Sequence, residues 1–96
     1  MVIVHGSVLI QEGKMEEAVQ LSLEHVHRSR AEPGCISHAV HRDCENERLV
    51  FFEEWEDQAS LQEHFKVPES RTFVERLTKL ASAPPEMAIY DAQRVS

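Results

Sequence analysis

The sequence of 96 residues predicts one α+β domain, in which an antiparallel sheet is built in the order β-α-β-β-α-β. Three observations lead to this prediction. Four short runs are rich in aliphatic and aromatic residues, and two longer segments between them repeat apolar residues at helical spacing. Glycine, proline or polar clusters separate these segments. A chain of this length forms a single domain with a small core, so we expect residues 1–96 to fold as one unit.

The first half of the chain predicts a strand, a helix and a second strand. Residues 2–10 are almost continuously apolar, which indicates a strand buried on both faces. A helix is expected from about Lys14 to Arg30, with acidic residues in its first turn and basic residues in its last. Pro33-Gly34 ends it, and residues 35–43 form the next strand. The helix packs through a stripe of Met15, Ala18, Val19, Ser22 and Val26.

The second half predicts a strand, a broken helix and a last strand. Residues 48–56 follow a polar turn and pair with the preceding strand as a hairpin. Asp57 is a favourable N-cap for a second helix. Pro68 interrupts that helix, and Ser70 is expected to cap its continuation. After a Pro-Pro pair, residues 87–95 supply the fourth strand.

This element order is the ferredoxin-like pattern, with both helices on one face of the sheet. The other face must be solvated or covered, and the strands carry more apolar surface than two short helices hide. We therefore expect a homodimer that packs through its open sheet faces, a dimeric α+β barrel. The apolar strand residues behind this expectation are Ile3, Leu9, Ile36, Val40, Phe51 and Ile89.

Composition excludes several classes of protein. The formal net charge of −7 argues against nucleic-acid binding, which needs a basic face. No apolar run approaches the roughly 20 residues of a membrane span. The N-terminus predicts a strand and lacks the basic flank of a signal peptide. The two cysteines, Cys35 and Cys44, make no disulfide framework, so we expect a cytoplasmic protein with free thiols.

A candidate site lies where the third strand meets the second helix. Trp55 ends the strand and His64 follows it by nine residues, so an indole and an imidazole meet near one corner. His64 is a candidate general base, since histidine ordinarily titrates near neutrality, or else a packed polar residue. Trp55 is suited to stack a planar ligand or to close the core. Glu53 shares strand parity with Phe51 and Trp55 and needs a partner, either His64, an arginine or a group across a dimer interface.

The remaining histidines and the cysteines do not predict a metal site. Histidines two apart on a helix do not share a face, and histidines three apart on a strand lie on opposite faces. The cysteines lack paired-ligand spacing. No nucleotide fingerprint is visible either, so we expect neither metal nor cofactor. The residues concerned are His25 with His27, His38 with His41, and Cys35 with Cys44.

Three segments resemble the antibiotic biosynthesis monooxygenase (ABM) domain family. They are Glu32-Pro33-Gly34-Cys35 at the entry to a strand, Phe52-Glu53-Glu54-Trp55-Glu56-Asp57, and Leu61-Gln62-Glu63-His64-Phe65 with Pro68 beyond. The resemblance covers nearly the whole chain in length, element order and spacing. It implies a dimer built through the sheets, with a pocket between sheet and helices in each subunit.

The resemblance implies a cofactor-independent monooxygenase, or else an oxidase, that acts on a small quinol or polyphenol with O₂. Glu53, Trp55 and His64 occupy the family's most recognisable positions. In this hypothesis His64 takes the phenolic proton, Trp55 stacks the aromatic ring, and Glu53 orients His64. His38 stands where many relatives have a tyrosine. Further substrate-binding residues would be Phe51, His38 and Phe65.

Two other functions stay open at this point. His64 resembles the axial ligand of haem-degrading relatives, but Gly6 stands where that branch usually has an asparagine. The first alternative is therefore a haem-binding or haem-degrading monooxygenase. The second alternative is a non-enzymatic dimer that binds a small ligand or acts in a stress response. A second histidine often follows the proline in the family, and here Glu69, Ser70 and Arg71 occupy that region instead.

Overall fold

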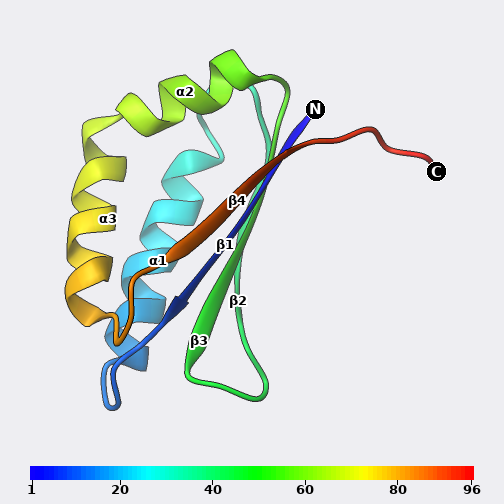
Figure 1. Ribbon diagram of the computed structural model, residues 1–96. Helices are drawn as coiled ribbons and strands as arrows, with labels where there is room; N and C mark the ends of the chain where they lie inside the picture. The colour runs from blue at the N-terminus through cyan, green and yellow to red at the C-terminus, as the bar shows by residue number, and fades with distance from the viewer.

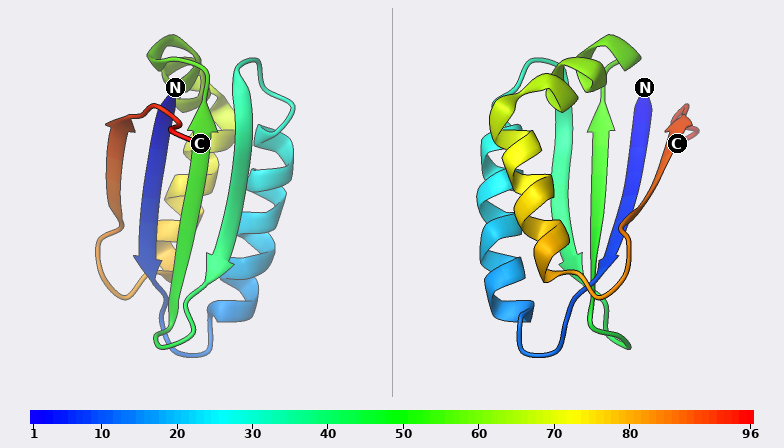
Figure 2. Two further views of the ribbon diagram at one scale, coloured as in Figure 1. Left: turned by 90° about the vertical axis from the view of Figure 1, so that its right-hand side faces the viewer. Right: turned by 60° about the vertical axis from the view of Figure 1, so that its left-hand side comes forward.

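The computed structural model describes residues 1–96 and shows a four-stranded antiparallel sheet with all helices on one face (Figure 1). The strand order is β2-β3-β1-β4, and the left view of Figure 2 shows the strands side by side in front of the helices. This confirms the ferredoxin-like α+β fold. The strands are β1 (Val2–Leu9), β2 (Cys35–Arg42), β3 (Arg48–Trp55) and β4 (Glu86–Asp91), and the helices are α1 (Met15–Ser29), α2 (Gln58–Lys66) and α3 (Pro68–Leu80).

Strand β1 alternates between a buried and a partly exposed face. Val2, Val4 and Val8 point toward the helices and are at most 2% exposed, whereas His5 on the other face is exposed. The prediction of a strand buried on both faces is therefore wrong for this chain. The sequence of β1 does not alternate clearly between apolar and polar residues, because some residues on the open sheet face, such as Ile3, are also hydrophobic.

The helix α1 uses a wider packing face than its apolar residues indicate. Beyond the predicted stripe, Leu21, His25 and Ser29 are buried, and Val19 is only partly buried. The Ser29 hydroxyl donates to the His25 carbonyl at 2.7 Å, which satisfies a polar group inside the helix layer. One of the buried polar residues of this face, His25, belongs to the site described below.

The second helical region is split in two by Pro68, as predicted. The Asp57 carboxylate caps α2 by accepting from the Ser60 N–H at 2.8 Å. Helix α3 then begins at Pro68 itself, because a proline lacks only an N–H that the first turn leaves unpaired anyway. Ser70 is therefore not the cap that we expected. It is buried inside α3, where its hydroxyl accepts from Arg28 at 3.3 Å.

The turn between α1 and β2 is held tightly against the start of α2. Gly34 has a φ of +82°, and a side chain there would collide with Ser60. Its carbonyl accepts from the Glu56 N–H at 2.9 Å. The turn residues before Gly34, including Glu32, are thereby placed beside α2.

The edge strand β4 lies beyond the cover of the helices (Figure 2). It ends at Asp91, earlier than the predicted 87–95, and Met87 and Tyr90 remain 57% and 56% exposed. Phe52, on the open face of the central strand β3, is 38% exposed. Of the residues behind the dimer prediction, Phe51 and Val40 instead pack into the core under the helices. No helix has the length and hydrophobicity needed to cross a membrane.

Candidate functional site

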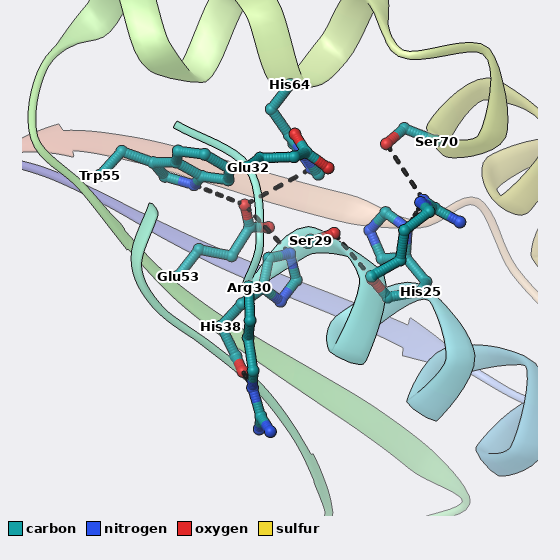
Figure 3. Close-up of polar contacts among 10 residues, drawn as sticks. His25, Ser29, Arg30, Glu32, His38, Glu53, Trp55, His64 and Ser70 are labelled. Carbon is teal, nitrogen blue, oxygen red and sulfur yellow. Dashed lines mark hydrogen bonds and ion pairs between the residues drawn. The ribbon is translucent and has the colours of Figure 1, made fainter. Parts of the chain in front are cut away.

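Three histidines from three different elements meet beneath the helices (Figure 3). His25 comes from α1, His38 from β2 and His64 from α2, and each is at most 5% exposed. Their ring centroids are 5.3, 5.4 and 5.6 Å apart. One donor atom from each ring lies within 4.8 Å of the others, so the rings form a nearly equilateral cluster. Imidazole nitrogens arranged in this way are a donor set that could hold a metal ion.

The orientation of the His64 ring is fixed by Glu32. The His64 Nδ1–H donates to Glu32 Oε1 at 2.9 Å, since a carboxylate oxygen only accepts. In the neutral ring the lone pair is then on Nε2, which lies 3.9 Å from Glu53 Oε1, longer than a hydrogen bond. The indole of Trp55 packs against the ring at a centroid distance of 4.7 Å. The orienting role that we expected for Glu53 thus falls to Glu32.

Glu53 is a buried carboxyl group, 6% exposed, between the cluster and the core. Its Oε1 accepts from the Trp55 Nε1–H at 2.9 Å. Burial raises the pKa of Glu53, against the opposing effects of the Trp55 hydrogen bond and of His64. The shift favours the protonated acid, which is the form that can deliver a proton.

Two of the three histidines are held neutral. Burial, followed by the neighbouring histidines and arginines, lowers the pKa of His25 and of His38 to about 3. His38 Nε2 lies 3.4 Å from Glu53 Oε1, but a neutral imidazole makes no ion pair there, and neither of its ring nitrogens has a hydrogen-bond partner. His25 Nδ1 accepts from Arg28 Nη2 at 2.7 Å, and its ring stacks on Phe73 at 4.0 Å.

A cavity of about 620 Å³ opens beside the histidine cluster. It lies between α3, the central strands β1 and β3, and the start of β4, and its volume suits a small organic ligand. His25, Glu53 and His64 form a polar patch on its wall. Apolar side chains form much of the remaining wall, among them Val8, Phe51, Phe65, Phe73, Val74 and Leu77.

The structure brings most of the sequence-predicted site residues to this cavity. Phe51, Glu53, His64 and Phe65 line it. Trp55 does not line it, because it is fully buried and packs against His64 as part of the core. Stacking on the ligand is therefore not the role that its position allows.

His38 also lies outside the cavity lining. It sits 2% exposed, with its ring 5.6 Å from that of His64, so direct contact with a ligand in the cavity does not fit its position. Two residues that sequence reasoning missed are His25 and Glu32. His25 follows Ser22 of the predicted stripe by three residues, and only this helical spacing could have suggested the first. No local signal points to the second.

The fold and the cavity define a small α+β domain of the kind that binds small molecules. Residues 1–76 match the family described as antibiotic biosynthesis monooxygenase. The match covers most of the chain, and the protein therefore belongs to the antibiotic biosynthesis monooxygenase family. This confirms the resemblance drawn from the three sequence segments.

Solved structures and one curated protein are similar along the whole domain. An uncharacterized protein of Synechocystis sp. (strain ATCC 27184 / PCC 6803 / Kazusa) is 38% identical over 90 residues, which are 93% of this chain and 61% of that protein. The chain thus spans less than two thirds of that relative's length. A crystal structure of an antibiotic biosynthesis monooxygenase is 24% identical with a TM-score of 0.90, over 98% of this chain and 100% of that one. A conserved protein from Methanosarcina mazei Go1 is 26% identical with a TM-score of 0.91, and the match covers 96% of this chain and 92% of that one.

Proposed function

We propose that this protein is a monooxygenase that oxidises a small quinol or polyphenol with O₂ in the cavity beside His64. One observation carries the proposal. His64 presents a free Nε2 lone pair at the wall of an aromatic-lined cavity, while its Nδ1–H is held by Glu32 at 2.9 Å. An imidazole oriented by a carboxylate is a general base whose proton-accepting nitrogen has a fixed direction.

The proposed reaction takes all its electrons from the substrate. His64 removes the phenolic proton, and the electron-rich anion transfers electrons to O₂ in two one-electron steps that form a bond between a ring carbon and oxygen. Protonation gives a ring hydroperoxide. Loss of water breaks the O–O bond and leaves one oxygen atom on the ring, so that quinol and O₂ give hydroxyquinone and H₂O. An enclosed apolar site favours this sequence because it limits side reactions with solvent.

The other residues of the wall have distinct roles in this proposal. Phe51 and Phe65 present aromatic surface to the flat substrate. Glu53, whose pKa burial raises, donates the proton that leaves with the departing hydroxide. Trp55 acts indirectly, since it holds Glu53 by its indole N–H at 2.9 Å and packs on His64.

The assembly that we propose is a homodimer through the open sheet faces. The support is the exposed apolar surface there, where Phe52 and Tyr90 are 38% and 56% exposed. Cys35 and Cys44 are free thiols, which fits a reducing, cytoplasmic setting.

Oxygen uptake tests the proposed activity directly. The purified protein is supplied with a panel of quinols and polycyclic phenols in an oxygen electrode, with protein-free samples to measure autoxidation. We expect at least one compound to be consumed well above its autoxidation rate. Uptake equal to autoxidation with every compound would contradict the proposal. Hemin added to the same protein is expected to give no Soret shift, because Gly6 offers no side-chain donor at that position.

A further inference from the structure

We propose that His25, His38 and His64 form a binding site for one divalent transition-metal ion of the zinc class. The three imidazoles come from α1, β2 and α2 and meet with their donor atoms within 4.8 Å of one another. Imidazole nitrogen is a preferred ligand of zinc and of its neighbours in the first transition series. This inference goes beyond the proposed oxygenase activity and concerns a different state of the same cluster, because an ion bound to His64 Nε2 would occupy the nitrogen that acts as the base in the metal-free protein.

The spacing of the rings agrees with that of a tetrahedral site. With metal–nitrogen bonds of about 2.0–2.1 Å, ring centroids lie about 3.2 Å from the ion and therefore about 5.2 Å from each other. The observed separations are 5.3, 5.4 and 5.6 Å. In a bound site the nitrogens approach one another to roughly 3.4 Å. The rings thus stand at the required separation already, and rotation of the side chains brings the nitrogens together.

The partners around the cluster are those that a metal site requires. Metal-bound histidines commonly donate their other ring N–H to a carboxylate, as His64 does to Glu32 at 2.9 Å. Glu53 adds a second buried carboxyl, 3.4 Å from His38 Nε2 and held by Trp55. The Glu32 carboxylate would offset part of the charge of a divalent ion.

His38 gives the independent indication that a partner belongs here. Its side chain is fully buried, yet neither ring nitrogen has a hydrogen-bond partner. An unpaired buried polar group is costly and rare in native proteins. A metal ion bound to one ring nitrogen of His38 would give that nitrogen a partner and remove this energetic cost.

The ligand that must rearrange most is His25. Arg28 Nη2 donates to its Nδ1 at 2.7 Å, which places the ring hydrogen on Nε2. Metal binding therefore requires Arg28 to release this nitrogen or the ring to turn over. Either change keeps the near-parallel stacking on Phe73, at 4.0 Å and 5°. Because His25 and His64 also line the cavity, the fourth position of the ion would face a ligand there.

Cobalt titration of the purified protein, after chelator treatment, tests the site without any assay of activity. We expect one equivalent of Co²⁺ to give the intense visible absorption of a tetrahedral ion and Zn²⁺ to displace it. His38→Asn and His64→Gln are each expected to weaken Co²⁺ binding by about 100-fold or more. His27→Gln and His41→Gln, at exposed positions, are the matched controls and should bind as the parent does.

A weak octahedral spectrum, or a tetrahedral one that both cluster variants retain, would overturn the proposal. Should the variants fail to fold, imidazole NMR signals of the unaltered protein decide the question. Zn²⁺ is then expected to shift the signals of the three buried histidines and to leave those of His5, His27 and His41 in place. Shifts confined to the exposed three would refute the site.

Discussion

Replacement of His64 by glutamine is expected to lower kcat by about 10²–10⁴-fold, the usual contribution of a general base. Glutamine can keep a polar contact with Glu32, but its amide does not accept the phenolic proton. The fall should appear in kcat more than in KM, because the aromatic wall that binds the ring is unchanged. Steady-state oxygen uptake with the best substrate of the panel measures both constants.

The matched control is His27→Gln, which removes an exposed imidazole from α1 and should leave kcat unchanged. Glu32→Gln provides the second comparison, because it keeps the shape of the partner but removes its charge. We expect an intermediate loss of kcat together with an altered pH profile. Equal turnover of His64→Gln and the parent protein, with both folded by circular dichroism, would remove His64 from the mechanism.

Truncation of Trp55 to alanine is expected to lower the free energy of unfolding by about 3–5 kcal/mol. The side chain is fully buried, packs with Val2, Val4 and Leu61, and donates to Glu53 at 2.9 Å. A loss of this size is a large part of the roughly 5–15 kcal/mol that stabilises a small domain. Urea unfolding followed by circular dichroism measures it at neutral pH.

The comparison with Trp55→Phe separates packing from hydrogen bonding. Phenylalanine keeps an aromatic ring in the core but leaves Glu53 without the indole donor, so we expect a smaller loss of about 1–3 kcal/mol. If alanine at this position cost less than about 1 kcal/mol, the core role assigned to Trp55 would be wrong. Such a result would favour an indole that stacks on a ligand.

The fold could be predicted because its signals are local. Asp57 precedes α2 and caps it, Pro68 divides the second helical region, and Gly34 adopts the positive φ that its turn needs. The errors also have local causes. Ser70 looked like a cap, but Pro68 supplies the first helical residue, and the buried hydroxyl pairs with Arg28 instead. A contact between residues that are far apart in the sequence cannot be predicted from the residues around either partner.

The site was only partly predictable for the same reason. Glu53, Trp55 and His64 lie within one strand-to-helix segment, so their proximity follows from strand parity and short spacing. The histidine cluster joins residues 25, 38 and 64 across three elements. Helical spacing places His25 and His27 on different faces of α1, as predicted, but spacing within one element cannot predict which elements the fold brings together. Glu32 becomes the partner of His64 only because its turn is packed against α2.

The most direct test of the oxygenase account is the fate of oxygen in a reaction run under ¹⁸O₂. Mass spectrometry of the quinone product is expected to show one ¹⁸O atom per molecule, with the second atom in water and no accumulation of H₂O₂. The amounts of O₂ and of substrate consumed should be equal. An unlabelled product accompanied by H₂O₂ would show that the protein is an oxidase and would contradict the monooxygenase account.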